Sequence, residues 1–96
     1  MRVSFNQLAE RELNEAAEYY QRESPALSAT FLAEVEHTCT QITEYPDAAP
    51  AVLGVIRRRL LRRFPYALLY RLHGDTVRIL AVMNLKRRPA YWIGRS

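Results

Sequence analysis

The hydrophobic pattern changes its period part-way along the chain, and this change limits the folds open to it. Between Asn6 and Pro46 apolar residues recur at helical spacing, whereas from residue 55 onward they alternate or run together as in β-strands. Pro25 divides the helical part in two, because the residue before a proline is pushed out of the helical region. The sequence therefore predicts two helices followed by a sheet.

Each predicted helix has a starting signal and an apolar stripe. Asn6 is expected to cap the first helix, and Ser24 with Pro25 at the first helical position is expected to start the second. The two stripes consist of Ala9, Leu13, Ala16 and Tyr20 in the first helix and Leu27, Phe31, Val35, Cys39 and Ile42 in the second. A tight connection makes the two helices an antiparallel hairpin.

Short strands surround and follow this hairpin. They are expected at residues 2–5, 55–61, 66–72 and 76–83, with a loop at 47–54 and a turn at 73–75. The order β-α-α-β-β-β predicts an α+β fold, in which the hairpin packs on one face of a small, mainly antiparallel sheet. We expect residues 1–96 to form a single domain, with the other sheet face left to arginine and tyrosine side chains.

Charge is divided unevenly along the chain. Residues 1–48 carry three arginines and nine acids, whereas residues 49–96 carry eleven basic residues and only Asp75, so a net charge of +4 conceals two opposite halves. Such a split indicates a polyanionic or acidic partner, the alternative being that the halves neutralise each other across the fold. The single cysteine excludes an internal disulfide and a cysteine-based zinc site. With no apolar run of membrane-spanning length, we expect a cytoplasmic protein without metal, cofactor or membrane contact.

The polar residues of the helices give no catalytic set. Cys39 is expected to be buried, and His37 and His73 to lie at the surface. The acids of the first helix are expected to form a solvated face or a contact face for a partner: Glu10, Glu12, Glu15 and Glu18. No Ser-His-Asp set and no spaced pair of acid and histidine is present, which argues against a hydrolase with the usual groups.

Two basic clusters are the candidate sites. The first places five arginines in residues 57–63, where alternation along one strand turns some of them toward the open sheet face. Arginine binds phosphates and carboxylates bidentately, although ion pairs with the helix acids are an alternative. The second cluster interleaves basic residues with Tyr91 and Trp92, which suits nucleic acid or an acidic protein groove, unless both aromatics simply pack. The candidate binding residues are Arg57, Arg59, Arg62, Arg63, Tyr70, Arg78, Lys86, Arg87, Arg88, Tyr91, Trp92 and Arg95.

Several segments together resemble one known family. The hairpin sequences "AERELNEAAEYYQRESP" and "FLAEVEHTCTQITEYP", the strands "FPYALLYRL" and "GDTVRILAVM" and the terminal "RRPAYWIGR" resemble the RelE/ParE superfamily of type II toxin–antitoxin toxins. The resemblance spans nearly the whole chain and implies a small antiparallel sheet with a helical hairpin on one face. It also implies a growth-inhibiting toxin that is silenced by a cognate antitoxin, and operator DNA bound indirectly through that antitoxin.

The family has two kinds of target, and the residues favour one of them. RelE-like members cut ribosome-bound mRNA without a metal, for which Arg62, Arg63, Lys86, Arg88 and Tyr91 are the candidate catalytic residues here. Many relatives carry a histidine where this chain has Asn84, and asparagine exchanges no proton near neutral pH. We therefore expect the ParE-like activity, inhibition of DNA gyrase by binding, with mRNA cleavage as the alternative. A non-toxic nucleic-acid-binding domain is the third possibility.

Overall fold

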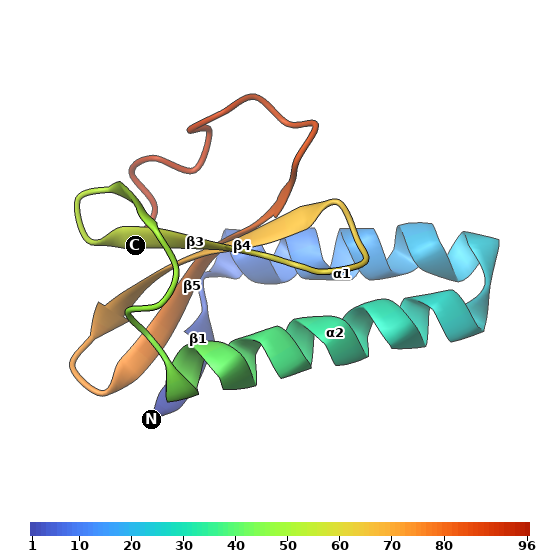
Figure 1. The fold of residues 1–96 in the computed structure, drawn as a ribbon. Coiled ribbons are helices and arrows are strands. Elements are labelled where there is room, and N and C mark those ends of the chain that lie inside the picture. Colours follow the sequence, from blue (N-terminus) through green and yellow to red (C-terminus); the bar gives the residue numbers. More distant parts are fainter.

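The structure, a computed structural model, describes residues 1–96 and has two helices and five strands (Figure 1). The elements in chain order are β1 (Arg2–Phe5), α1 (Gln7–Glu23), α2 (Pro25–Glu44), β2 (Ala51–Leu53), β3 (Ile56–Leu60), β4 (Tyr66–His73) and β5 (Thr76–Asn84). The predicted α+β fold and helical hairpin are confirmed. The short strand β2 was not expected, because its residues lie in the segment predicted to be a loop.

The sheet has the strand order β1-β5-β4-β3-β2. All neighbouring strands are antiparallel except β1, which pairs in parallel with β5. The sheet is therefore mixed, and mainly antiparallel as predicted. The β4–β5 hairpin forms its centre and turns at Gly74, whose φ of 61° is one that residues other than glycine rarely adopt.

The helix ends follow from local chemistry. The Asn6 side chain accepts hydrogen bonds from the backbone N–H groups of Leu8 at 2.7 Å and Ala9 at 3.4 Å, so the predicted cap is confirmed. Ser24 connects the two helices, but its side chain makes no cap hydrogen bond. Ser28 on α2 donates its hydroxyl to the carbonyl of Ala17 on α1 at 2.8 Å, which fixes the two helices against each other.

Both helices cover one face of the sheet and bury the main core against it (Figure 1). Four aromatic rings form the centre of this core, with centroids 5.0 to 6.3 Å apart: Tyr20, Phe31, Phe64 and Tyr66. Aromatic pairs at such distances and tilted angles stabilise a core beyond the burial of their area. The predicted stripes are buried here apart from Leu27, which is exposed, and Leu13, which is half-buried.

The second face of the sheet is apolar where residues near the C-terminus cover it, so the prediction that it carries arginine and tyrosine side chains is right only in part. Three arginines, Arg58, Arg71 and Arg78, do project from this face, whereas the tyrosines of the strands do not. Alternate residues of β4 point to opposite faces, so Tyr66 and Tyr70 point toward the helices and Ala67 and Leu69 away from them. Residues 85–96, hereafter the C-terminal segment, cross this second face (Figure 1), and Trp92 packs on Ala67, Leu69, Ala81 and Met83. The run "YALLY" is thus buried on both faces.

Neither helix combines the length and apolar character needed to cross a membrane. No group of three or more histidine, cysteine, aspartate or glutamate side chains lies together in a way that could hold a metal ion.

Candidate functional site

The arginines of β3 divide between the two faces of the sheet. Arg57 and Arg59 lie on the helix face, where Arg57 Nη1 donates to the carbonyl of Ala49 at 2.7 Å and Arg59 Nη2 donates to Gln41 Oε1 at 3.4 Å. Arg57 also forms an ion pair with Asp47 at 3.6 Å. Both residues therefore hold the 45–50 loop and α2 rather than projecting as a binding strip. Arg58, which is not among the candidate binding residues, is exposed on the opposite face.

Arg62 and Arg63 follow β3 in a loop, so the prediction that they belong to one arginine-bearing strand is wrong. The carboxylate of Glu34 on α2 anchors this loop. It accepts hydrogen bonds from the backbone N–H groups of both arginines and from Arg63 Nε at 3.1 Å. The Glu34 side chain is 5% exposed, whereas that of Arg63 is 70% exposed, and Arg62 is exposed with no side-chain partner.

The contacts of Glu34 decide its protonation. Burial alone would raise the pKa of this carboxyl group. Hydrogen bonds from the backbone and side chain of Arg63 and from the backbone of Arg62 outweigh burial and hold the pKa below its ordinary value. The folded chain therefore favours the charged carboxylate, which stabilises the fold above the ordinary pKa of 4.5 and ceases to do so as the pH falls through the lowered value.

This linkage predicts a pH-dependent effect of Glu34→Gln. At pH 7 the substitution is expected to lower the free energy of unfolding by about 2 kcal/mol, because a neutral amide replaces a carboxylate that accepts several hydrogen bonds. The difference from wild type should shrink as the pH falls below 4.5, measured by urea denaturation across a pH series. Glu36→Gln, at an exposed position on the same helix, is the control. If the two variants lose stability in parallel at every pH, Glu34 does not have this role.

The C-terminal segment starts with a turn at Asn84. Its side-chain oxygen accepts from the backbone N–H of Lys86 at 2.9 Å, and its carbonyl accepts from the N–H of Arg87 at 2.9 Å. Asparagine commonly forms such a turn with its own side chain. Asn84 is therefore a structural residue here, and the turn leaves Lys86, Arg87 and Arg88 exposed to solvent.

Glu12 on α1 attaches the rest of this segment. Its carboxylate accepts from the Tyr91 hydroxyl at 2.6 Å, from Arg95 Nη1 at 2.8 Å and from the backbone N–H of Val82 at 3.1 Å. The side chains of Glu12 and Arg95 are 12% and 13% exposed, so this ion pair is largely shielded from water. The prediction that Glu12 belongs to a solvated face or to a contact face for a partner is wrong, since its carboxylate joins a helix, a strand and the C-terminal segment.

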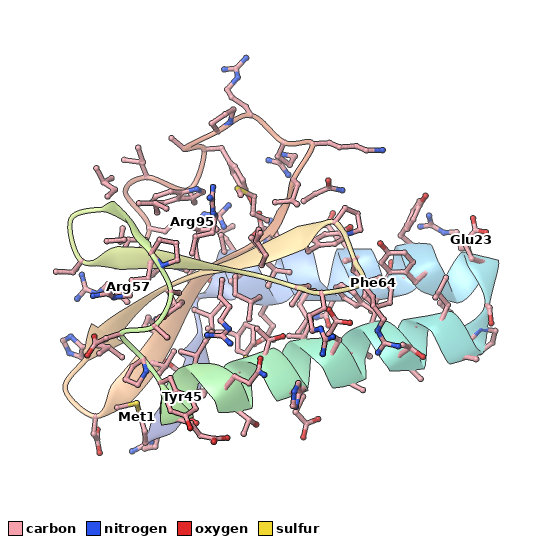
Figure 2. The ribbon with its side chains drawn as sticks, viewed as in Figure 1. Met1, Glu23, Tyr45, Arg57, Phe64 and Arg95 are labelled. Atoms are coloured by element: carbon pink, nitrogen blue, oxygen red, sulfur yellow. The ribbon has the colours of Figure 1, made fainter.

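The two aromatics of the segment are structural. Trp92 is 5% exposed and belongs to the second apolar cluster. Of the two predicted roles, it therefore packs on the sheet and its ring is not free to stack on a nucleic acid base. The Tyr91 ring lies beneath the guanidinium of Arg87 at 4.2 Å and that of Arg95 at 5.0 Å. Burial, followed by the hydrogen bond to the Glu12 carboxylate, raises the Tyr91 pKa well above its ordinary value. Figure 2 shows Arg95 between the C-terminal segment and the sheet.

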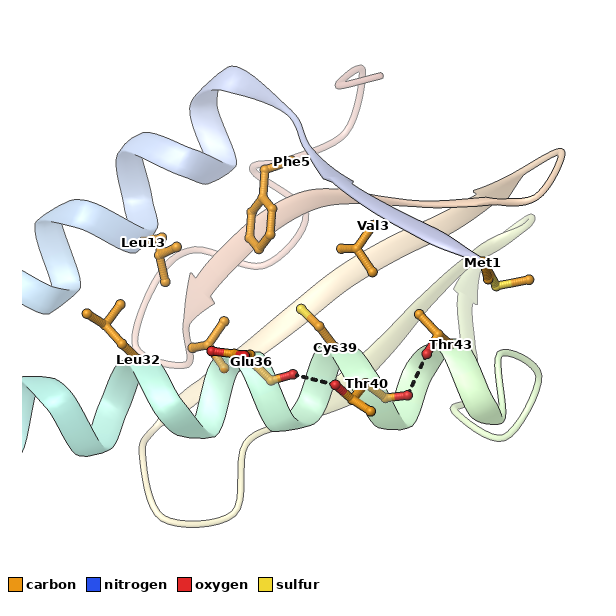
Figure 3. Close-up of a pocket in the computed structure, with 10 residues that line it drawn as sticks. Met1, Val3, Phe5, Leu13, Leu32, Glu36, Cys39, Thr40 and Thr43 are labelled. Atoms are coloured by element: carbon orange, nitrogen blue, oxygen red, sulfur yellow. Dashed lines mark hydrogen bonds between the residues drawn. The ribbon is translucent and has the colours of Figure 1, made fainter.

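A separate apolar groove of about 540 Å³ lies between the edge strand β1 and α2 (Figure 3). In Figure 3, Val3 and Phe5 of β1 face Leu32 and Cys39 of α2 across it. Cys39 is buried, as predicted, and burial raises the pKa of its thiol to about 11. The thiol is therefore protonated near neutral pH and unsuited to act as a nucleophile.

Comparison with known proteins identifies the family to which the chain belongs. The sequence profile described as "ParE toxin of type II toxin-antitoxin system, parDE" matches residues 3–89 of the 96. The chain belongs to this ParE toxin family. A solved structure titled "Chromosomal ParDE TA system from P. aeruginosa" contains a chain that aligns with a TM-score of 0.77 over 90% of this chain and 97% of that one. The two sequences are 16% identical, so the likeness establishes the fold alone. No curated protein sequence matches the chain.

In this ParE family member the candidate binding residues of the two basic clusters divide into two groups by their contacts. The first group is engaged within the fold: Arg57, Arg59, Tyr70, Arg78, Tyr91, Trp92 and Arg95. Tyr70 is 0% exposed and its hydroxyl donates to the carbonyl of Pro46 at 2.8 Å. The second group is exposed and comprises Arg62, Arg63, Lys86, Arg87 and Arg88.

Proposed function

We propose that the chain is a toxin that inhibits growth by binding DNA gyrase and is silenced by a cognate antitoxin. The observation that carries the choice of target is the exposed run Lys86, Arg87 and Arg88, which the structure presents on a segment held at both ends. A rigid cationic segment loses little conformational entropy when an acidic protein surface binds it. Membership of the ParE family supports the toxin part of the proposal.

The chemistry of the segment argues against the alternative, mRNA cleavage. Metal-free cleavage needs one group to remove the 2′-hydroxyl proton and another to protonate the leaving oxygen. The segment contains no histidine, cysteine or acidic side chain, and the Tyr91 hydroxyl already donates a hydrogen bond to Glu12. Arg63 is bound to Glu34 on α2, whereas Tyr91 is bound to Glu12 on α1, so these two candidate catalytic residues are anchored to different helices.

We further propose that the antitoxin uses acidic side chains to cover exposed arginines. Arg62 has no side-chain partner, and Arg63 is mostly exposed, beside a polar hollow of about 350 Å³ that also includes His37. The ParDE title of the similar structure supports a toxin–antitoxin pairing. On this proposal the chain acts in the cytoplasm, where gyrase works, and reaches operator DNA only through the antitoxin.

A single experiment in cells separates the two targets. We expect that induced expression will leave a reporter plasmid relaxed on chloroquine gels before protein synthesis falls. The reason is that negative supercoils are no longer replaced once gyrase is inhibited, whereas protein synthesis declines only later. Co-expression of the antitoxin encoded beside the gene should restore normal topology. Early loss of protein synthesis with cleaved mRNA and unchanged plasmid topology would contradict the proposal and favour the ribonuclease alternative.

A further inference from the structure

Two arginines stand directly opposite each other on the inner strands β4 and β5, close to the turn that joins these strands. Arg71 on β4 pairs in register with Arg78 on β5, so both side chains project from the same face. Like charges at directly opposed positions destabilise a sheet unless an anion compensates them. No aspartate or glutamate side chain forms an ion pair with either arginine, since those ion pairs are formed by Arg57, Arg63 and Arg95.

The two arginines differ in how far their donors are used. Arg78 Nη1 donates to Ser4 Oγ at 3.2 Å and to the carbonyl of Phe5 at 3.0 Å, and Nη2 donates to the backbone oxygen of Ser96 at 3.5 Å. Arg78 is therefore fixed in place by β1 and the C-terminal segment. The Arg71 guanidinium has a single contact, from Nη2 to His73 Nδ1 at 3.4 Å, although a guanidinium carries five N–H donors. Most of the Arg71 donors are free for a ligand.

A hollow of about 360 Å³ opens at this pair, lined by Ser4, Arg71, His73, Thr76, Arg78 and Ser96. No lining residue is apolar and none has an acidic side chain. The absence of apolar lining disfavours a nucleoside base or an aliphatic ligand as the recognised group. Two guanidinium groups with hydroxyls beside them offer donors from several directions, which suits a tetrahedral oxyanion with three or four acceptor oxygens better than a planar carboxylate.

We propose that this hollow is a binding site for a phosphate group, supplied either by a small phosphorylated molecule or by the backbone of a nucleic acid. Arg78, held rigid by its contacts, fixes one side of the phosphate, and Arg71 closes on it from β4. Ser4 and Thr76 add hydroxyl donors. The site is independent of the proposed gyrase contact at residues 86–88, and either proposal can fail without the other.

Titration of the ¹⁵N-labelled protein with inorganic phosphate tests the site. The chloride concentration is lowered as phosphate is added, so that the ionic strength stays constant. Changes in general charge screening then do not contribute to the chemical shifts. We expect saturable shifts of the backbone amides of residues 71–78. Arg71→Gln should weaken phosphate binding by at least about tenfold, the loss expected from one charge-assisted hydrogen bond. Arg22→Gln, which removes the same charge at an exposed position at the end of α1, should leave the affinity unchanged.

Thermal unfolding gives a second readout. Phosphate should raise the Tm of the wild type and of Arg22→Gln, but that of Arg71→Gln much less, because only ligands that bind the folded state stabilise it. Without phosphate, Arg71→Gln should unfold at the same or a higher temperature than wild type, since it removes a like-charge pair.

The source of the phosphate follows from two further titrations. Saturable binding of a short single-stranded oligonucleotide that is lost in Arg71→Gln would assign the site to a nucleic acid backbone. If a mononucleotide binds as tightly as the oligonucleotide, the site is assigned to a small phosphorylated molecule. The proposal would be overturned by any of three results. The shifts could rise linearly without saturating, the Arg71 and Arg22 variants could bind phosphate with equal affinity, or acetate could occupy the site as well as phosphate does.

Discussion

Replacing Lys86, Arg87 and Arg88 with glutamine is expected to weaken binding to DNA gyrase by at least about 100-fold, or about 3 kcal/mol. In the proposed function these exposed cations contact an acidic protein surface. A well-placed charged contact at a protein interface contributes about 1 kcal/mol or more to the binding free energy. The fold should hardly change. Only Arg87 has a side-chain contact within the chain, over the Tyr91 ring, and exposed contacts of this kind contribute about 0.5–1 kcal/mol.

The matched control is the variant with Arg2, Arg11 and Arg22 replaced by glutamine. It removes the same charge from exposed positions in the acidic half of the chain. Affinity for purified gyrase is measured over a series of salt concentrations, and the variant of residues 86–88 should also lose most of the salt dependence. Equal affinities of the two variants would mean that net charge, and not the C-terminal segment, determines binding.

Replacing Trp92 with alanine is expected to have the largest effect on stability. The side chain is 5% exposed and covers the apolar second face formed by Ala67, Leu69, Ala81 and Met83. Truncation of a buried tryptophan usually costs about 3–5 kcal/mol, which is a large part of the total for a domain of this size. Urea denaturation measures the loss, and the variant should also bind hydrophobic dyes because an apolar sheet face is uncovered.

Ile93→Ala is the control for Trp92. Ile93 is the next residue and is 57% exposed, so its truncation should change the free energy of unfolding by less than about 0.5 kcal/mol. Since Trp92 is the only tryptophan, the emission of the folded wild type should be that of a buried indole and should shift to the red on unfolding. A solvent-like emission in the folded state, or equal stabilities of the two variants, would show that Trp92 does not pack on the sheet.

The sequence predicted the parts of the fold that depend on neighbouring residues. The helical spacing of Ala9, Ala16 and Tyr20, the cap at Asn6 and the break at Pro25 all act within a few residues. These features predicted the helical hairpin. The strand β2 was missed because its three residues are exposed and carry no alternating pattern.

The faces of the sheet were harder to assign, because they depend on which elements cover them. The segment "YALLY" alternates, but Ala67 and Leu69 on the second face are as apolar as the residues on the first. The structure shows that Trp92, more than twenty residues later in the chain, covers this face. A sheet strand that is apolar on both faces is typical of burial on both sides, and this signal was available in the sequence.

The anchoring carboxylates could not be found from sequence spacing. Glu12 contacts Tyr91 and Arg95, and Glu34 contacts Arg63, across separations of 79, 83 and 29 residues. Glu12 and Glu34 look like other helix acids along the chain, and what distinguishes them is burial after folding. For the same reason the number of arginines free to bind a partner was overestimated from the sequence. Four of the candidates make hydrogen bonds within the fold: Arg57, Arg59, Arg78 and Arg95.

The central claim, that the C-terminal segment inhibits DNA gyrase through Lys86, Arg87 and Arg88, is tested most directly by supercoiling of relaxed plasmid with purified gyrase. Wild type, the glutamine variant of these three residues and the variant of Arg2, Arg11 and Arg22 are titrated side by side. We predict that wild type and the second variant inhibit at similar, sub-micromolar concentrations and that the first variant does not. Full inhibition by the first variant, or no inhibition by folded wild-type protein, would contradict the account.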